Sequence, residues 1–463
     1  MDLDAGSSHP QLPNMDGPPI VQDLDDCLNI LESQPSLKNL YTQICFCFSV
    51  ADDSSHSAII NTLTNGLERL SASFPWVAGQ VVDEPSGVFR IKPLEKIPRL
   101  VVKDLRHDPS IPTMDALKGA NFPFSMLDEN IIAPCNTLTG GSDKDSPVFL
   151  LQANFITRGL MLTLVGSHNA MDMTGQGHIF DLFAKACRNE PFTSAELSSG
   201  NVARRNMIPL LDDSYQPGDE LAHQIVNPTL SPPLLSAPPK STWAYFTFNH
   251  TALTTLKSLA TQTLSLGYIS TDDALSAFIW QSILRNRLPR LNPTAKATFA
   301  RAVDVRRYLN ISPMYLGLMQ SMTYTTYTLQ KLLEEPLGGI ASQLRSALDP
   351  KTSDLGYKTR ALATFLDRSP DKNVVSFTAT IDLSTDIMLS SWSKLDCYEL
   401  DFNLGLGKPE CVRRPQFVPV ESLVYLMPRA LDGEIAVAIC LRDEDMERLK
   451  ADEEFVRYGS YVG

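Results

Sequence analysis

The sequence predicts a mixed α/β (α+β) fold divided into two domains. The chain has 463 residues, more than one compact core holds, which favours two units of about 200 residues each. Apolar runs typical of strands alternate with stretches in which apolar residues recur at helical spacing. A proline-rich stretch separates two regions of this kind. We therefore expect two mixed domains with a cleft between them.

The proline-rich stretch places the domain boundary. Pro228, Pro232, Pro233, Pro238 and Pro239 fall close together, and such proline density favours extended, weakly paired chain. The residues before Pro19 are polar and lack the apolar segment of a signal peptide. We expect a flexible leader over residues 1–20, a first domain over 21–190, a crossover linker over 191–240 and a second domain over 241–463.

The first domain begins with a strand and a helix laid on it. Residues 41–50 form an apolar run typical of a strand. After it, apolar residues recur at helical spacing, namely Ile59, Ile60, Leu63, Leu67 and Leu70. Pro75 cannot continue this helix, and residues 77–82 resume as a strand.

A hairpin and a second helix complete the first domain. Residues 148–156 and 160–165 are apolar runs joined by a short link that contains Gly159, which is typical of a hairpin. The following apolar stripe, which includes Ile179 and Phe183, predicts a helix that ends near Arg188.

The second domain repeats the mixed pattern. Residues 243–248 read as a strand, and Ser270 followed by Asp273 is the signature of a helix cap. Three more strands are expected near the end, at residues 387–392, 422–427 and 435–441. The charged segment 442–455 carries spaced apolar residues and predicts an amphipathic terminal helix.

Composition narrows the function classes. The net charge is −13, from 53 acidic and 40 basic residues, which repels polyanions and argues against nucleic-acid binding. A local group of basic residues can still bind a phosphate-bearing small molecule within a Debye length of about 8 Å. No apolar run approaches the roughly 20 residues of a membrane helix. The eight cysteines lack a CxxC pair, so we expect buried free thiols in a reducing, cytoplasmic setting.

The most informative motif joins His168 and Asp172 at the end of the predicted hairpin. A buried strand delivers the histidine to a turn, where an imidazole titrating near neutrality can accept a proton from a hydroxyl. Asp172 can hold the loop. Short His/Asp spacings also occur by chance, but His168 follows a buried strand, whereas His9 and His56 sit in polar surroundings.

Several longer segments, in the same order, resemble the BAHD acyltransferases, and within them most nearly the fungal trichothecene 3-O-acetyltransferases. Nearly the full length fits this plan. The segments are the His168-x-x-x-Asp172 element, Phe74 to Gln80, Ala170 to Gln176, Ser270 to Gln281, Asp401-Phe402-Asn403-Leu404-Gly405, Gly405 to Glu410 and Leu441 to Glu454.

The resemblance implies a fold and a reaction. Two domains of chloramphenicol-acetyltransferase-like topology would enclose an active-site channel, with acetyl-CoA entering from one side and the alcohol from the other. His168 would act as the general base, and Asp172 would orient the loop through an ion pair with an arginine. The expected reaction is acetylation of a sesquiterpenoid mycotoxin, at the 3-hydroxyl of a trichothecene. Acetyl-CoA is then a co-substrate, no cofactor or metal is bound permanently, and the protein is a monomer.

The resemblance also assigns the remaining candidate residues. Ser390 and Trp392 match the strand at the reaction centre, and both are capable donors to an oxyanion; the alternative is a strand-edge serine and a core tryptophan. Lys257, Ser270, Thr271 and Asp272 match a basic residue and a helix start that would bind CoA, although Lys257 without the resemblance is more typical of a solvated helix residue.

The Asp401 to Gly405 motif is expected to be structural. We predict that Asp401 pairs with Arg306 and so joins two parts of the second domain. Asn403 and Leu404 replace the family's usual glycine and tryptophan. Asparagine tolerates a left-handed conformation, so the turn can survive, whereas the packing made by the tryptophan is in doubt.

Three other functions stay open. The same chemistry could act on another terpenoid, alkaloid or polyketide alcohol, or on an amine. A metal hydrolase could use His168, Asp172 and His178, although this spacing matches no zinc pattern. A non-catalytic CoA-binding or ligand-binding protein could keep the fold without turnover.

Overall fold

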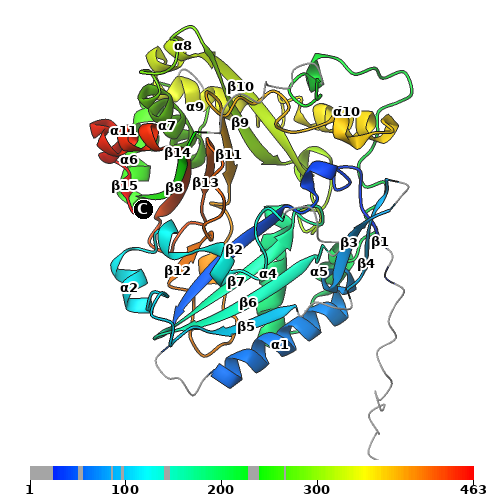
Figure 1. Cartoon of the computed structure of the whole chain (residues 1–463). Helices are drawn as coiled ribbons and strands as arrows, with labels where there is room; N and C mark the ends of the chain where they lie inside the picture. Colours follow the sequence, from blue (N-terminus) through cyan, green and yellow to red (C-terminus); the bar gives the residue numbers. More distant parts are fainter. Residues whose placement is uncertain are drawn as a thin grey trace, which may run out of the picture.

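The computed structural model consists of two lobes, each built on its own β-sheet, stacked one above the other (Figure 1). It describes residues 24, 26–50, 56–84, 87–94, 99–139, 146–227, 239–264 and 267–463. The expected leader, and the linker prolines from Pro228 to Pro238, lie outside these residues. The mixed α and β composition of both domains is confirmed.

The first lobe contains a five-stranded sheet in the order β12-β2-β7-β6-β5. β2 (Tyr41–Ser49) pairs antiparallel with β7 (Gly159–Ser167) along its whole length, and β7 forms the predicted hairpin with β6 (Phe149–Ile156). β5 (Leu100–Asp104) lies parallel to β6 at one edge. Every residue of β6 and β7 is buried, because both faces of the sheet are covered.

Helices cover the first sheet on both faces. On one face α1 (His56–Ser73) packs against α4 (Met173–Cys187), and their apolar stripes meet Phe46, Phe48 and Leu162. On the other face α2 (Met114–Gly119) and α3 (Glu129–Ile132) cover Cys45, Cys47 and Met161. A separate small sheet in the order β1-β4-β3 is made of β1 (Asp26–Cys27), β3 (Gly79–Asp83) and β4 (Phe89–Pro93), and it lies at the opposite end of this lobe from α2 (Figure 1).

The second lobe is built on a seven-stranded sheet in the order β10-β9-β11-β13-β14-β8-β15. β11 lies parallel to β9 and β13, and the other pairs are antiparallel. Its strands are β8 (Ser241–Phe248), β9 (Lys296–Asp304), β10 (Gln320–Thr328), β11 (Ile387–Ser391), β13 (Leu423–Leu426), β14 (Ile435–Arg442) and β15 (Ser460–Tyr461).

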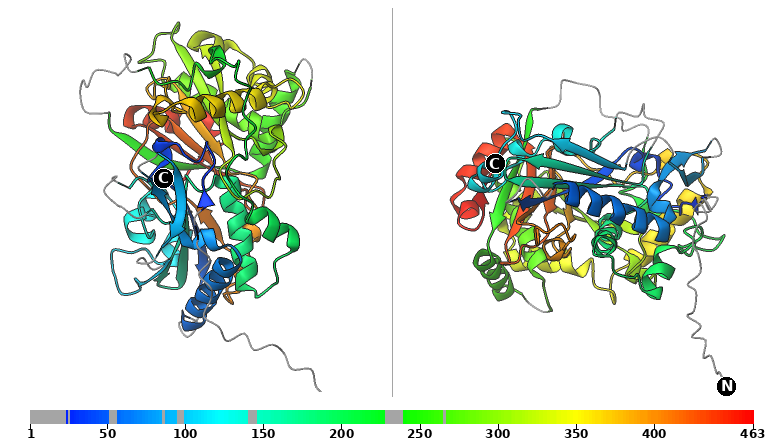
Figure 2. Two further views of the ribbon diagram at one scale, coloured as in Figure 1. Left: turned by 90° about the vertical axis from the view of Figure 1, so that its right-hand side faces the viewer. Right: turned by 90° about the horizontal axis from the view of Figure 1, so that it is seen from below.

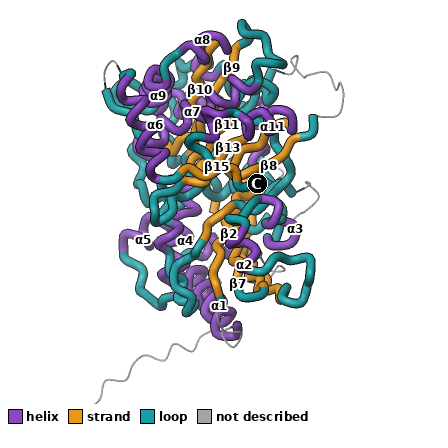
Figure 3. Tube along the Cα trace, turned by 90° about the vertical axis from the view of Figure 1, so that its left-hand side faces the viewer, coloured by secondary structure: helices purple, strands orange, loops and turns teal. Residues whose placement is uncertain are grey.

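Helices cover this second sheet as well, with α6, α7 and α9 side by side in Figure 3. Serine 270 caps α7 in the predicted box with Asp273. The helices of this lobe are α6 (His250–Gln262), α7 (Thr271–Asn286), α8 (Leu329–Glu334), α9 (Leu337–Ser346), α10 (Leu355–Arg368), α11 (Asp443–Ala451) and α12 (Glu453–Val456). The predicted terminal helix is therefore split at Asp452, which caps α12.

The crossover between the lobes is more ordered than its composition suggests. The prediction of weakly paired chain over 191–240 is wrong for its first part, where α5 (Ser194–Gly200) begins with a capping box of Thr193 and Glu196. Downstream of α5, Arg204, Ile208 and Leu221 are buried. The prolines gather after residue 227, so nothing prevents the earlier residues from packing against the lobes.

A long excursion from the second lobe completes the first lobe. β12 (Cys411–Arg413) pairs antiparallel with β2 and becomes an edge of the first sheet. Upstream of β12, the Phe402 ring contacts Phe46, Phe48 and Phe183 of the first lobe, at centroid distances of 5.4, 6.4 and 5.7 Å. The Asp401 to Gly405 motif therefore packs on the first lobe, and its assignment to the second domain is wrong.

The predicted pairing of Asp401 with Arg306 is also wrong. The Asp401 carboxylate accepts the backbone N–H of Asn403 at 2.8 Å, and the Asp401 carbonyl accepts from Arg188 of the first lobe at 2.7 Å. Arg306 instead pairs with Asp172. The reason is the burial of Phe402 in the first lobe, which carries its neighbour Asp401 away from β9. Asn403 and Gly405 do take positive φ, 54° and 73°, as the turn requires.

The C-terminus also ties the lobes together, and it lies at their junction in Figure 2. The Gly463 carbonyl accepts from the backbone N–H of Phe124 in the first lobe and of Tyr245 in the second, at 3.0 and 3.1 Å. The two aromatic rings stack at 4.0 Å. The pairing of β12 with β2, the stacking of Phe124 on Tyr245 and the hydrogen bonds of Gly463 thus fix the position of one lobe against the other.

Candidate active site

His168 sits in a tight loop between β7 and α4. Its backbone N–H donates to the Leu40 carbonyl at 2.9 Å, and Ala170 and Met171 both donate to the Ser167 carbonyl. Asp172 caps α4 by accepting the Gly175 N–H at 2.8 Å. Backbone hydrogen bonds therefore fix the loop at its start, its middle and its end.

The histidine ring has a defined tautomer. Nδ1 lies 3.3 Å from the Met171 carbonyl oxygen, which can only accept, so Nδ1 carries the hydrogen and Nε2 is left as an acceptor. Burial lowers the pKa of His168 below its ordinary 6.5, with Asp172 opposing the shift and Arg414 adding to it. The ring is therefore neutral at pH 7, as a base must be.

A buried ion pair between the lobes holds the end of the loop. Arg306 lies beside Asp172, with Nη1–Oδ2 and Nη2–Oδ1 distances of 2.9 and 3.0 Å, a bidentate arrangement. The Met319 N–H donates to Asp172 at 2.7 Å, and Arg306 also donates to Tyr315 and Gly317 carbonyls. The expected arginine partner of Asp172 is thus Arg306.

A cavity of about 640 Å³ lies where the lobes meet. The predicted residues Asp172, Ser270, Asp272, Ser390 and Trp392 line it, so the fold brings together positions far apart in the chain. His168 is not among the lining residues and lies four residues before Asp172 in the same loop.

Ser390 and Trp392 meet at the end of β11. The Trp392 indole N–H donates to the Ser390 hydroxyl at 3.0 Å. The tryptophan is buried, whereas the serine is partly exposed. The indole hydrogen is therefore engaged, and the Ser390 O–H is the donor left for the cavity.

The start of α7 carries a charged cluster at the cavity. Asp273 accepts from Arg301 at 2.9 Å and from Arg345 Nε at 2.7 Å, and the Ser270 hydroxyl accepts from Arg345 Nη2 at 2.7 Å. Asp272 accepts from the Ser391 hydroxyl at 2.8 Å. Ser270 and Asp272 are thus fixed at the cavity wall.

The other predicted CoA residues lie outside the cavity lining. Thr271 does not line it, and neither does Lys257, whose ammonium lies 5.3 Å from the centroid of the Tyr268 ring. The ring is 65% exposed, and Arg345 lies 5.7 Å from its centroid. Lys257 is therefore linked to the cavity only through Tyr268 and Arg345.

Several cations at the cavity were missed by the sequence analysis. Arg345, Arg307 and Lys394 line it and retain solvent exposure. None belongs to a recognisable motif, and Arg345 reaches Ser270 from 75 residues away in the chain. Only proximity in the fold identifies them.

The geometry does not favour the hydrolase alternative. Both Asp172 oxygens are engaged by Arg306 and backbone N–H groups, and His178 Nε2 lies 2.9 Å from the Pro313 carbonyl. Within the described ranges, no cluster of three or more His, Cys, Asp or Glu residues is arranged to hold a metal ion. In the same part of the chain, no helix is long and apolar enough to cross a membrane.

Comparisons with known proteins agree with this geometry. Residues 40–187 match the model of a trichothecene 3-O-acetyltransferase-like N-terminal domain, and residues 132–456 match that of the Transferase family. The O-acetyltransferase dmxR13 of Cryptosporiopsis sp. is 61% identical over 460 residues, covering 96% of this chain and 100% of the relative. The trichothecene 3-O-acetyltransferase TRI101 of Fusarium sporotrichioides is 51% identical over 453 residues, covering 96% and 98%.

A solved structure extends the similarity to three dimensions. TRI101 of F. graminearum, complexed with coenzyme A and deoxynivalenol, superposes with a TM-score of 0.91 at 48% identity, covering 95% of this chain and 100% of that one. The two-lobed arrangement is thus shared with a protein that binds CoA and a trichothecene.

Proposed function

The chain belongs to the Transferase family of BAHD acyltransferases, and from this membership we propose that it transfers an acetyl group from acetyl-CoA to a sesquiterpenoid hydroxyl. The proposed acceptor position is the 3-hydroxyl of a trichothecene. The observation that carries the proposal is the state of His168: neutral, with Nδ1 tied to Met171 and its loop held by the Asp172–Arg306 pair.

In the proposed reaction, His168 is the general base. Nε2 removes the proton from the acceptor hydroxyl as its oxygen attacks the thioester carbonyl. The tetrahedral intermediate then expels the CoA thiolate, which takes the proton back from His168. No acyl-enzyme is needed, since the thioester is already activated and the protein mainly aligns two substrates.

Ser390 is the proposed donor to the oxyanion. Its hydroxyl accepts the indole hydrogen of Trp392 and so has its own hydrogen free to donate. A fixed donor aimed at developing charge stabilises the intermediate without reorganisation. Trp392 acts through Ser390 in this proposal, because its N–H is already engaged.

Acetyl-CoA is proposed to bind along the start of α7, as a co-substrate that leaves after each turnover. Arg345, Arg307 and Lys394 would meet its phosphates, with Ser270 and Asp272 at the wall. The exposed Tyr268 ring, flanked by Lys257 and Arg345, offers a stacking surface for the adenine. Solved relatives support this co-substrate, since their complexes contain coenzyme A.

A second acceptor class is favoured by one comparison. The 61% identical relative is named an O-acetyltransferase without a trichothecene in its name, and it is more similar to this chain than the 51% identical trichothecene enzyme. The alternative proposal keeps the chemistry and replaces the trichothecene by another fungal secondary metabolite that carries a hydroxyl.

The test is release of free thiol from acetyl-CoA by the purified protein, with and without a trichothecene that has a free 3-hydroxyl. The matched control is the same trichothecene with that hydroxyl already acetylated. Release that needs the free 3-hydroxyl and His168 supports the first proposal. No release, with acetyl-CoA bound, directs the search to other hydroxylated metabolites. Binding without turnover of any acceptor would leave a ligand-binding protein.

A further inference from the structure

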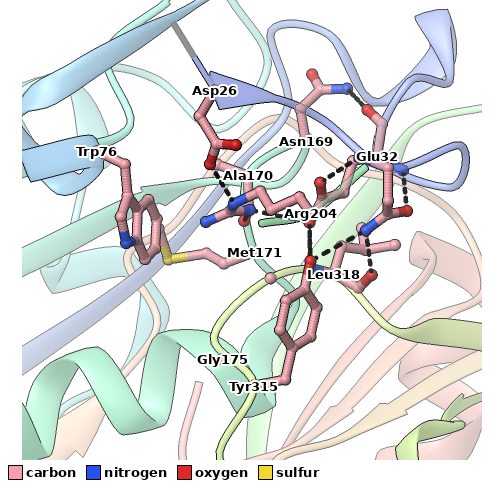
Figure 4. Close-up of polar contacts among 12 residues, drawn as sticks. Asp26, Glu32, Trp76, Asn169, Ala170, Met171, Gly175, Arg204, Tyr315 and Leu318 are labelled. Atoms are coloured by element: carbon pink, nitrogen blue, oxygen red, sulfur yellow. Dashed lines mark hydrogen bonds and ion pairs between the residues drawn. The ribbon is translucent and has the colours of Figure 1, made fainter. Parts of the chain in front are cut away.

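A second buried ion pair lies behind the histidine loop (Figure 4). Arg204 Nη1 lies 2.9 Å from Glu32 Oε1, and the two residues are 2% and 0% exposed. Glu32 belongs to the segment before β2, and Arg204 belongs to the crossover between the lobes. Neither lines the cavity. Because desolvation offsets much of the Coulombic gain of a buried ion pair, stability alone does not account for this one.

This pair contacts the two residues that follow His168. The Arg204 Nη1 group donates to the Ala170 carbonyl at 2.6 Å. The Asn169 side-chain amide donates to the Glu32 carbonyl at 2.7 Å and to that of Gln34 at 3.3 Å. The middle of the histidine loop is therefore held by Glu32, its segment and Arg204, as the end is held by Arg306.

Both ion pairs meet the same loop of the second lobe. Glu32 Oε1 accepts the backbone N–H of Leu318 at 3.0 Å and the Tyr315 hydroxyl at 3.1 Å. The next N–H along the chain, that of Met319, donates to Asp172. Two consecutive peptide groups thus bind one carboxylate of each pair, which couples the two pairs.

The packing around Glu32 leaves little freedom. A Cβ added to Gly317 would overlap Glu32 Oε1, so this residue must be glycine for the loop to approach. The Arg204 guanidinium lies over the Trp76 ring, 4.1 Å from its centroid. Glu32 Oε2 accepts the Asn29 N–H at 2.8 Å. Both Glu32 oxygens and the face of Arg204 are therefore occupied by fixed partners.

We infer that Glu32 and Arg204 are positioning residues for acetyl transfer, which hold the Ala170–Met171 peptide so that the Met171 carbonyl stays on Nδ1 of His168. This inference rests on the proposed role of His168 as base. Without Arg204, the buried Ala170 carbonyl loses a donor, and the peptide rotates to recover one. The Met171 carbonyl then leaves Nδ1, and the tautomer with hydrogen on Nε2, which cannot accept a proton, becomes populated.

The test compares Arg204→Lys with Arg287→Lys. Arg287 forms an equally buried pair with Asp445 inside the second lobe and does not line the cavity. Each variant loses some of the hydrogen bonds that the guanidinium makes in different directions, and each melts at lower temperature. At a temperature where both are folded, Arg204→Lys lowers kcat about 10- to 100-fold with the KM for acetyl-CoA within about twofold. Arg287→Lys leaves both constants unchanged.

A second readout reports His168 without any substrate. Burial lowers the pKa of His168, while Asp172 and Arg414 act on it in opposite directions. A loosened loop admits water, so the pKa rises toward the ordinary value in Arg204→Lys. The pH dependence of His168 carbethoxylation by diethyl pyrocarbonate, followed by mass spectrometry of its peptide, measures this pKa in the full-length protein. In Arg287→Lys the midpoint stays at the wild-type value.

The outcomes separate this inference from the proposed function. An unchanged kcat and an unchanged His168 pKa in folded Arg204→Lys overturn it and leave the pair a purely structural anchor. If Arg204→Lys does not fold, Asn169→Ala removes the other contact of the histidine loop with the Glu32 segment without burying an unpaired charge, and the same readouts decide. If the wild-type protein acetylates no acceptor, the proposed function is wrong. The pH midpoints of His168 carbethoxylation in the wild type and in Arg204→Lys still test the positioning role.

Discussion

The proposed base His168 needs a fixed tautomer and a neutral ring, and different contacts supply the two. The Met171 carbonyl holds the hydrogen on Nδ1. Burial keeps the ring neutral by lowering its pKa, although Asp172 opposes this. Arg306 pairs with the Asp172 carboxylate, so in the proposed mechanism Asp172 orients the loop and accepts no proton from His168.

Replacing His168 by Ala is expected to reduce turnover about 10²- to 10⁴-fold, because the general base is lost. Affinity for acetyl-CoA stays near the wild-type value, since His168 holds the acceptor side of the reaction. Steady-state kinetics and calorimetric titration with CoA measure the two effects. His107→Ala, at an exposed position, is the control. A variant that loses folding and turnover together would give His168 a structural role.

The pH profile is expected to have its acid midpoint below 6.5. Only the neutral ring accepts a proton, and the folded pKa lies below its ordinary 6.5. kcat/KM therefore stays high as pH falls to 6.5 and drops only as pH passes the lowered pKa. The unfolded chain binds this proton first, so His168 also costs stability below about pH 6.5. Chromatography of the acetylated product against pH measures the midpoint, and a value above 6.5 would contradict the assignment.

Ser390→Ala is expected to lower kcat about 10²- to 10³-fold, the loss usual for an oxyanion donor. Trp392→Phe removes only the indole N–H that fixes Ser390, so its effect on kcat is smaller. Both are measured with saturating acetyl-CoA and compared with Ser393→Ala, whose hydroxyl lies outside the cavity lining. A larger loss in Trp392→Phe than in Ser390→Ala would make the indole the direct donor.

At the scale of elements, the excursion that carries Phe402 and β12 acts as a clamp. It leaves the second lobe after β11, buries Phe402 among three phenylalanines of the first lobe and pairs β12 with β2. The Asp401 carboxylate closes the turn on the Asn403 N–H, and the Asn403 side chain reaches the Cys187 carbonyl at 3.4 Å. The motif therefore supports the fold, and none of its five residues lines the cavity.

Phe402→Ala is expected to destabilise the protein by about 3–5 kcal/mol, as for other buried phenylalanines replaced by alanine. Asp401→Ala should cost about 0.5–1.5 kcal/mol, because it removes the one side-chain hydrogen bond that closes the turn on Asn403. Thermal unfolding measures both. Activity at a low temperature should follow the folded fraction. Loss of activity in fully folded Asp401→Ala would show that the motif takes part in the reaction.

At the scale of the whole molecule, the site depends on the lobes being in register. Asp172 comes from the first lobe and Arg306 from the second, and Met319 of the second lobe completes the carboxylate's contacts. Ser390, Trp392 and the α7 start also come from the second lobe. The pairing of β12 with the first sheet and the C-terminal hydrogen bonds of Gly463 hold the two lobes in this relative position.

Arg306→Met is expected to destabilise the protein by about 3–5 kcal/mol, since it leaves the buried Asp172 charge without its partner. Turnover falls as well, because the histidine loop loses its anchor in the second lobe. In the double variant Asp172→Asn with Arg306→Met, much of the stability returns while turnover stays low. Urea unfolding and kinetics of the wild type, of Arg306→Met, of Asp172→Asn and of the double variant measure the coupling. Additive losses of stability would show that the pair carries no coupling energy.

The local elements follow from the sequence alone, which also singles out His168 as the candidate base. Apolar runs and periodicity predicted β2, α1, the β6–β7 hairpin, α4 and β14, and the capping signature at Ser270 predicted the start of α7, because each of these patterns depends on residues close in the chain. His168 followed from a buried strand that ends in a turn, and the family resemblance from several ordered motifs.

The long-range partners of these residues follow from the packing of the two lobes. In the folded protein Arg306 pairs with Asp172, and Asp401 packs on the first lobe. Arg345 and Lys394 line the cavity. The same packing places Glu32 and Arg204, 172 positions apart, behind the histidine loop. Which arginine forms an ion pair with a given carboxylate depends on how the two lobes dock, and docking depends on the packing of whole sheets. No local sequence pattern predicts such a long-range ion pair.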